Sequence, residues 1–139
     1  MHELGELGSS RNYVDVHTQQ GATAIPGLLI LRPEEPLFFA STERVVAEVM
    51  ARVKGRHDLS AVVLSLEESA DLDSTAMECL LELKHSLAGI GKDLLLARAK
   101  TSVRDLLSRW DPQGLGKADT MFWSVADAVQ FSGENRPLG

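Results

Sequence analysis

Apolar residues occur along the chain in two spacings, and the change from one to the other separates predicted strands from predicted helices. Continuous apolar runs at 27–32, 61–66 and 93–99 have the length and composition of buried strands. Two shorter apolar segments predict further strands, one at 37–40 after a turn rich in proline and glutamate, and one at 120–124. The pattern thus predicts a sheet of about five strands.

Between these strands the apolar residues recur every three or four positions, which places them on one face of a helix. This spacing predicts helices at about 42–55, 74–90, 102–110 and 125–131. The inner face of the first helix is expected to hold Val45, Val49 and Val53. The inner face of the second is expected to hold Ala76, Leu80, Leu83, Leu87 and Ile90.

The elements follow one another as β-β-α-β-α-β-α-β-α, which predicts an α/β domain with parallel pairings in a mixed sheet. The domain is expected to span residues 25–133, because the apolar patterns typical of strands and helices begin at Ile25. Residues 1–24 are polar and glycine-rich and are predicted to be a linker, with only 13–16 extended. Residues 134–139 are predicted to be a C-terminal tail.

Composition and charge narrow the function classes. A chain of 139 residues with 44% hydrophobic content can bury one core and is too short for two ordinary domains. The net charge of −6 argues against a nucleic-acid binder, which usually presents a basic face. No run of about 20 apolar residues and no signal-peptide pattern is present, so we expect a soluble cytosolic chain. Cys79, the single cysteine, is expected to pack in the core.

The segment DLDST raises the question of catalysis. Asp71, Asp73 and Thr75 have the spacing of an aspartyl-nucleophile phosphotransferase motif. That chemistry needs the first aspartate at the end of a buried strand, usually with Mg²⁺ beside both carboxylates. Here the apolar run stops at Leu66, and the polar residues 67–70 separate it from the motif. We therefore expect no enzyme, no metal site and no cofactor.

The same segment also has the features of a helix N-terminus. Thr75 and Glu78 have capping-box spacing, and either Asp73 or Ser74 can serve as the N-cap. Asp73, Ser74 and Thr75 form the candidate site. From these residues alone, a helix cap with no further role and a regulatory loop that displays a hydroxyl both stay open.

Residues 61–110 resemble the STAS domain, a module shared by sulfate transporters and anti-sigma-factor antagonists. The common features are a buried strand, a loop ending in Asp-Ser/Thr-Ser/Thr, a helix, another strand and a helix of the R-x-x-L type. Segments 9–16 and 25–45 resemble the linker and first strands of SulP-family anion transporters, in which a Pro-Gly strand precedes a phenylalanine-containing strand. The resemblance runs from about Arg11 to Gln130.

This resemblance implies a STAS (SpoIIAA-like) fold, a central mixed β-sheet of about five strands flanked by about four helices, with the helices on one side. It also implies a regulatory and interaction domain at the cytoplasmic carboxyl end of a SulP-type transporter, on the cytoplasmic face of the bacterial inner membrane. Residues 1–24 would then be the linker that follows the membrane domain. The Met-His start favours an excised fragment over a stand-alone copy.

The resemblance further implies partners and a modification. In the antagonists, a partner kinase phosphorylates the hydroxyl after the aspartate, a position held here by Ser74 and followed by Thr75. The family's glycine two residues later is Ala76 in this chain. The expected partners are the membrane domain of the same transporter, a cytosolic regulatory protein, a second copy and, weakly, a nucleotide, but no nucleic acid. The alternative function is a stand-alone antagonist switched by phosphorylation at Ser74.

Four aromatic residues also bear on partner binding. Phe38 and Phe39 are expected in the sheet core, although adjacent residues of a short strand leave one of them facing outwards. Trp110 and Trp123 are expected to pack around the last helix. The alternative is an exposed aromatic patch that docks against a membrane domain.

Overall fold

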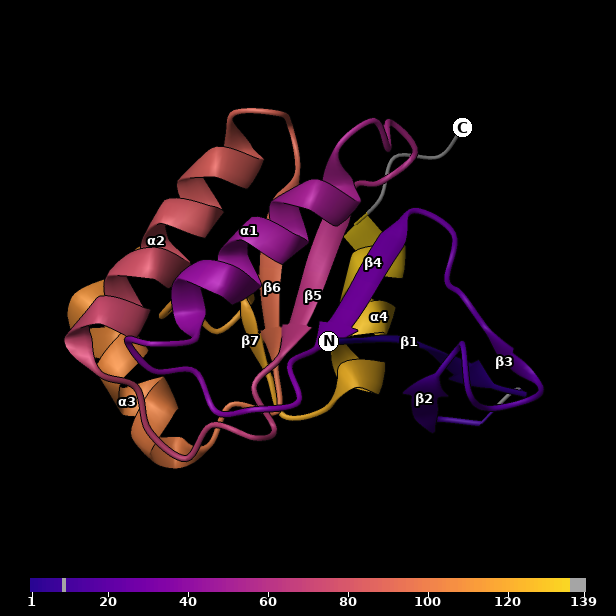
Figure 1. Ribbon diagram of the computed structural model, residues 1–139, viewed down its shortest axis with the longest axis horizontal. Coiled ribbons are helices and arrows are strands. Elements are labelled where there is room, and N and C mark those ends of the chain that lie inside the picture. The colour runs from indigo at the N-terminus through magenta and orange to yellow at the C-terminus, as the bar shows by residue number, and fades with distance from the viewer. Residues whose placement is uncertain (9, 136–139) are drawn as a thin grey trace.

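A computed structural model describes residues 1–8 and 10–135 and confirms the α/β class (Figure 1). No helix among these residues has the length and apolar character that crossing a bilayer demands. The elements are β1 (His2–Leu7), β2 (Tyr13–Asp15), β3 (Ala22–Thr23), β4 (Leu28–Arg32), α1 (Thr42–Val53), β5 (Ala61–Ser65), α2 (Ser74–Ala88), β6 (Asp93–Ala97), α3 (Thr101–Trp110), β7 (Met121–Phe122) and α4 (Val125–Asn135).

The strands form one mixed sheet in the order β2-β1-β4-β5-β6-β7, and β3 also pairs with β1. Strands β4 to β7 are parallel, while β1 runs antiparallel to β4 with His2 opposite Arg32. The sheet has seven strands rather than about five, because the N-terminal segment contributes three and the strand predicted at 37–40 does not form. The predicted mixed sheet is thus confirmed, and its parallel part is the predicted core of the domain.

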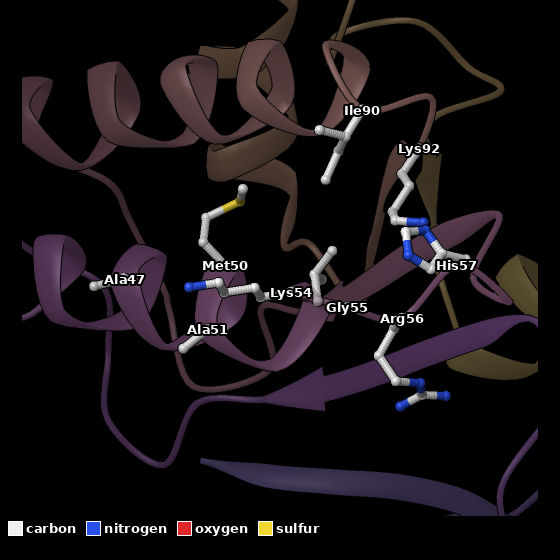
Figure 2. Close-up of a pocket in the computed structure, with 10 residues that line it drawn as sticks. Ala47, Met50, Ala51, Lys54, Gly55, Arg56, His57, Ile90 and Lys92 are labelled. Carbon is white, nitrogen blue, oxygen red and sulfur yellow. The ribbon is translucent and has the colours of Figure 1, made fainter.

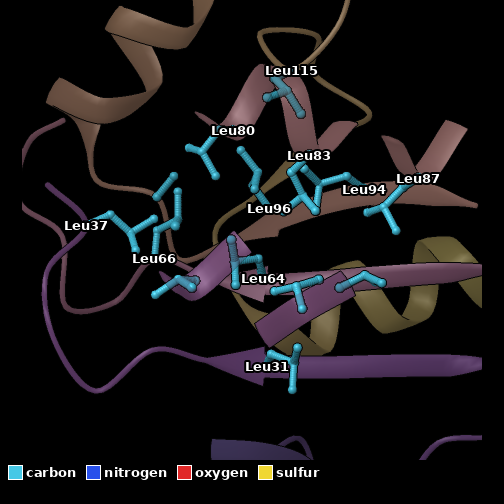
Figure 3. Packing of buried hydrophobic residues seen from close by; sticks show 14 of the residues in the cluster. Leu31, Leu37, Leu64, Leu66, Leu80, Leu83, Leu87, Leu94, Leu96 and Leu115 are labelled. Carbon is cyan, nitrogen blue, oxygen red and sulfur yellow. The ribbon is translucent and has the colours of Figure 1, made fainter. Parts of the chain in front are cut away.

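Both faces of the parallel strands are covered, and the expectation that all helices lie on one side is wrong. One set of alternate strand residues packs with α1, α2 and α3 (Figure 3), and the other set packs with α4, which lies behind the sheet in Figure 1. Strands that are apolar at every position need a cover on each face, since an apolar face left in water is unfavourable. The first set is Leu29, Leu31, Val62, Leu64, Leu94 and Leu96. The second set is Leu28, Ile30, Ala61, Val63, Leu95 and Ala97.

The N-terminal segment differs from the predicted linker. Strand β1 joins the sheet, and its Leu4 is only 3% exposed. A Cβ on Gly5 would lie 2.6 Å from the carbonyl oxygen of Thr23, so glycine allows β1 and β3 to approach. At the other end, α4 runs to Asn135, inside the predicted tail, and residues 136–139 lie outside the described residues.

The strand predicted at 37–40 is absent, and this correction shapes the candidate site. The backbone N–H of Leu37 donates to the buried Ser69 Oγ at 2.9 Å, so a side chain takes the place of a neighbouring strand. Phe38 O instead accepts a hydrogen bond from the side chain that begins α1. As a result, Phe38 and Phe39 are 40% and 67% exposed, and the prediction that they lie in the core is wrong.

Candidate functional site

Asp73 is the N-cap of α2. Its backbone is extended, and its Oδ1 accepts a hydrogen bond from the backbone N–H of Ala76 at 2.7 Å. This contact satisfies one of the N–H groups that the first helical turn leaves without an intrahelical partner. Of the two predicted candidates, the cap is therefore Asp73 and not Ser74. Ala76 is fully buried, which anchors the turn against the core.

The second carboxylate oxygen of Asp73 joins two distant segments. Its Oδ2 accepts a hydrogen bond from the backbone N–H of Phe39 at 2.8 Å. One side chain thus holds the loop before α1 against the start of α2. Because both oxygens already accept backbone hydrogen bonds, this carboxylate is engaged in structure. The sequence analysis found the cap but missed Phe39, since no local pattern links the two segments.

Ser74 and Thr75 lie at the first positions of α2, and both are exposed. Neither hydroxyl has a hydrogen-bond partner among residues 1–8 and 10–135. Nearby serines are used by the fold: Ser69 Oγ accepts from a backbone N–H, and Ser102 Oγ donates to the carbonyl oxygen of Ala70 at 2.5 Å. The structure thus brings Asp73, Ser74 and Thr75 together as predicted, and leaves the last two free at the surface. We call these three residues the α2 entrance.

Acidic side chains lie along the first turns of α2 and at the start of α1, which packs beside it. Burial raises the pKa of the Cys79 thiol, and the charges of Glu82, Glu43, Glu78 and Asp73 raise it further. The thiol is 8% exposed, which confirms the prediction of a packed core cysteine. An approaching partner therefore meets carboxylates around two exposed hydroxyls.

Asp71 does not stand where an aspartyl nucleophile would. Strand β5 ends at Ser65, and a loop separates it from Asp71, which is exposed. The Oδ1 of Asp71 accepts a hydrogen bond from the neighbouring backbone N–H of Leu72, at 2.9 Å. Among residues 1–8 and 10–135, no three His, Cys, Asp or Glu side chains are grouped as metal ligands.

An exposed aromatic pair adjoins the α2 entrance. The rings of Phe38 and Phe39 meet edge to face, with centroids 5.7 Å apart. Trp110 and Trp123 are also exposed, at 45% and 62%, and Trp123 lies under the guanidinium of Arg104 at 3.7 Å. The prediction that Trp110 and Trp123 pack inside around the last helix is therefore wrong, and the alternative of exposed aromatic side chains describes these residues better. The loop before α1 turns its aromatic side chains outwards because its backbone is bound to α2 and the loop after β5.

A separate cavity of about 550 Å³ lies between the carboxyl ends of α1 and α2 (Figure 2). Met50 and Ile90 contribute apolar surface to it. Lys92 is 8% exposed, and its Nζ donates to the carbonyl oxygen of Leu59 at 2.9 Å. The basic residues that line the cavity are Lys54, Arg56, His57 and Lys92. Sequence analysis did not find this cavity, because it forms only where residues 47–57 pack beside Ile90 and Lys92.

Comparison with protein families matches residues 14–128 to the family described as STAS domain. This match confirms the resemblance seen in the sequence. Among curated proteins, sulfate transporter 3.1 of Arabidopsis thaliana is 28% identical over 137 residues, covering 91% of this chain and 21% of the transporter. The chain thus spans about one fifth of the length of the curated relatives it matches.

Solved structures with the same fold include a transporter, an isolated domain and an antagonist. The murine solute carrier 26 family member A9 anion transporter matches with a TM-score of 0.87 at 23% identity, over 96% of this chain and 22% of that one. The SulP transporter STAS domain from Vibrio cholerae matches with a TM-score of 0.66 at 21% identity, over 84% and 91% of the chains. The unphosphorylated anti-sigma factor antagonist SpoIIAA matches with a TM-score of 0.63 at 15% identity, over 83% of this chain and 96% of that one. These likenesses confirm the predicted fold.

Proposed function

The chain belongs to the STAS domain family, and on that premise we propose that it is the cytoplasmic regulatory and interaction domain of a SulP-type secondary anion transporter. The curated relatives include sulfate transporters whose alignments cover about nine tenths of this chain. The chain spans only about a fifth of their length, so a role beside the transport path fits better than transport itself.

One observation carries the proposal: the α2 entrance displays groups for recognition and keeps none for catalysis. Both oxygens of Asp73 accept backbone hydrogen bonds, while Ser74, Thr75 and the exposed ring of Phe39 face solvent beside them. Loops that present side chains from a rigid helix start are common recognition surfaces. Both oxygens of this carboxylate are oriented by the backbone of the fold, which suits a structural role better than proton transfer to a substrate. We therefore propose that the domain is not an enzyme.

The proposed partners follow from the chemistry of two surfaces. The exposed Phe38–Phe39 pair suits contact with the membrane domain of the same transporter, or with a second copy of this domain. The negative α2 entrance suits a cytosolic regulatory protein with a basic surface. Weak nucleotide binding would use the cavity of Figure 2, with Lys54 and Arg56 at its wall, although the chain has no glycine-rich phosphate loop.

Phosphorylation of Ser74 would act as an electrostatic switch on this surface. A phosphate there would gain from the positive end of α2. It would also add negative charge beside Asp71 and Asp73, and so repel an acidic partner or recruit a basic one. The exposed hydroxyl directly after an aspartate is also the observation that favours the second candidate function, a stand-alone antagonist controlled at Ser74.

The test is uptake of radiolabelled sulfate by cells that express the transporter carrying this domain, with and without residues 14–128. The proposal predicts lower uptake by the deleted form at equal surface expression. Equal uptake by both forms would overturn it. If the reading frame that encodes the chain holds no membrane-spanning segments, and a cellular kinase phosphorylates Ser74, the antagonist function replaces the transporter function.

A further inference from the structure

A cleft separate from the cavity of Figure 2 lies at the carboxyl ends of the parallel strands, on the face of the sheet covered by α4. Its volume is about 320 Å³. Ligands of open α/β sheets commonly bind in crevices outside the carboxyl ends of the strands. The polar lining of this cleft also includes Asn12, Tyr13 and Glu67, and we use the name arginine cleft for five lining residues from separate segments: Arg11, Arg32, Ser65, Arg98 and Ser124.

Ser65, the last residue of β5, carries an unused hydroxyl into this cleft. The residue is 1% exposed, and its Oγ has no hydrogen-bond partner among residues 1–8 and 10–135. Its side chain lies on the same face of the sheet as Ala61 and Val63, which pack with α4. A buried hydroxyl without a partner is unfavourable, so it calls for an acceptor in the cleft.

The charges around Ser65 select a negative acceptor. Arg32 and Arg98 share the carboxylate of Glu67, at 3.8 Å and 3.5 Å. These separations exceed the roughly 2.7–2.9 Å of a charge-assisted hydrogen bond, so the guanidinium donors keep capacity for a further acceptor. Arg11 pairs more closely, with Asp127 at 2.7 Å. Asp127 on Arg11 and Glu6 on the Tyr13 hydroxyl lie next to the cleft, so the positive charge near Ser65 rests on Arg32 and Arg98, which share Glu67, the single lining carboxylate within the described residues.

Arg98 is held in a conformation that suits glycine better. Its φ is 57°, the single positive value found for a non-glycine residue within the described ranges. Side chains are disfavoured in this region by contact between Cβ and the backbone. The backbone is kept there by a hydrogen bond from Arg98 N to the carbonyl oxygen of Phe122 at 2.8 Å. An arginine at this position therefore points to a use for its side chain.

The start of α4 completes the lining. Ser124 Oγ accepts from the backbone N–H of Asp127 at 3.0 Å, while Val125 and Ala126, the first residues of the helix, line the cleft. The positive end of the helix dipole therefore adds to the arginine charges.

We propose that the arginine cleft binds a small tetrahedral oxyanion of the sulfate or phosphate class. The Ser65 hydroxyl donates to the anion, the guanidinium groups of Arg32 and Arg98 neutralise it, and the amino end of α4 faces it. Glu67 is the internal counter-ion that a bound anion displaces from the two arginines. Binding itself is independent of the proposed function, and only its use as a signal to a transporter rests on that function.

The experiment is an NMR titration of the ¹⁵N-labelled chain with sodium sulfate, inorganic phosphate or glycerol phosphate, at ionic strength held constant with sodium chloride. The proposal predicts saturable shifts of the amides of Ser65, Arg98 and Ala126. Tighter binding of glycerol phosphate than of inorganic phosphate would support the site and identify an esterified anion as its ligand. Tighter binding of the inorganic ions would support it with a free anion as the ligand.

Two variants separate binding from folding. Ser65→Ala removes an unsatisfied hydroxyl, so the variant stays folded, and its anion affinity falls about 5- to 10-fold, the loss of one hydrogen bond. Arg98→Gly keeps the backbone conformation and loses the guanidinium, so its affinity falls about 10-fold or more while its melting temperature is maintained. Arg44→Ala, which removes an exposed arginine of α1, is the control and binds as the parent does.

The proposal is overturned if sulfate and phosphate cause no shifts beyond those of chloride, or if Ser65→Ala and Arg98→Gly both bind as the parent does. Failure of this titration leaves the sulfate-uptake test unaffected, because that test does not involve the cleft. Conversely, a domain that binds the anion and does not alter uptake would contradict the proposed function alone.

Discussion

The α2 entrance and the arginine cleft both lie near the carboxyl ends of the parallel strands, but on opposite faces of the sheet. Their hydroxyl groups differ in exposure to solvent. At the α2 entrance, Ser74 and Thr75 are exposed, so water satisfies them and the fold is stable without a partner. In the cleft, the Ser65 hydroxyl is buried and unpaired. Exposed groups suit a macromolecule that arrives and leaves, whereas a buried group suits a small ligand that fills a defined space.

The two surfaces also differ in the charge of the side chains around them. Carboxylates surround the α2 entrance and raise the pKa of Cys79 beyond the effect of burial. Arg11, Arg32 and Arg98 line the cleft together with Ser65, and Glu67 is its one lining carboxylate among the described residues. A basic protein surface would therefore bind at the α2 entrance, and a small anion would bind in the arginine cleft on the other face of the domain.

The largest effect is expected for Asp73→Ala. The variant loses the acceptor for Ala76 N and the link to Phe39 N, and we expect a free energy of unfolding lower by about 1–2 kcal/mol. Urea denaturation followed by circular dichroism measures it. Asp73→Asn keeps one side-chain oxygen, so its free energy of unfolding should lie between those of the parent and of Asp73→Ala. If Asp73→Ala is as stable as the parent, Asp73 is free for a role other than capping.

Ser65→Ala is expected to change the free energy of unfolding in the opposite direction, in buffer without sulfate or phosphate. Removing a buried hydroxyl that lacks a partner should leave stability unchanged or raise it, by up to about 1 kcal/mol. The same urea experiment measures this change. A clear loss of stability would mean that the hydroxyl has a partner in solution and that the contrast between the two surfaces is wrong.

A smaller effect on folding is expected at Ser74. Because the side chain is exposed, Ser74→Ala and Ser74→Asp should each change the free energy of unfolding by no more than about 0.5 kcal/mol. In a transporter, however, Ser74→Asp should alter uptake more than Ser74→Ala does, since it adds a carboxylate beside Asp71 and Asp73. Equal, unaltered uptake in both would leave the α2 entrance as a structural cap only.

The reactivity of Cys79 probes the α2 entrance without changing the sequence. Only the thiolate is nucleophilic, and a raised pKa moves thiolate formation to higher pH. Alkylation by iodoacetamide should therefore be slower in the folded chain than in the urea-unfolded chain across pH 7–9, and its rise with pH should be displaced upwards. Equal rates for the two forms would contradict both the burial of the thiol and the negative field around it.

Local signals explain what the sequence predicted well. The valines of α1 at 45, 49 and 53 and the leucines of α2 recur at helical spacing, so each helix can be recognised from its own residues. The Asp73 cap precedes its helix directly, which is why the α2 entrance was predictable.

Distant contacts explain what the sequence predicted poorly. The loop at 37–40 has the composition of a strand, but its backbone bonds to Ser69 and Asp73, far along the chain. Strand β1 has few apolar residues, and its place depends on β4. The arginine cleft is assembled from five separate segments, so no spacing in the sequence could indicate it.

The most direct test of the central claim is sulfate uptake by the full-length transporter carrying Phe39→Ser. Phe39 is 67% exposed, so this change should leave the urea denaturation of the isolated domain unaltered. If the surface beside the α2 entrance docks the domain against its transporter, uptake should fall severalfold at equal surface expression. Arg109→Gln, an exposed change in the last turn of α3, is the matched control and should have little effect. Uptake by Phe39→Ser equal to that of the parent would contradict the account.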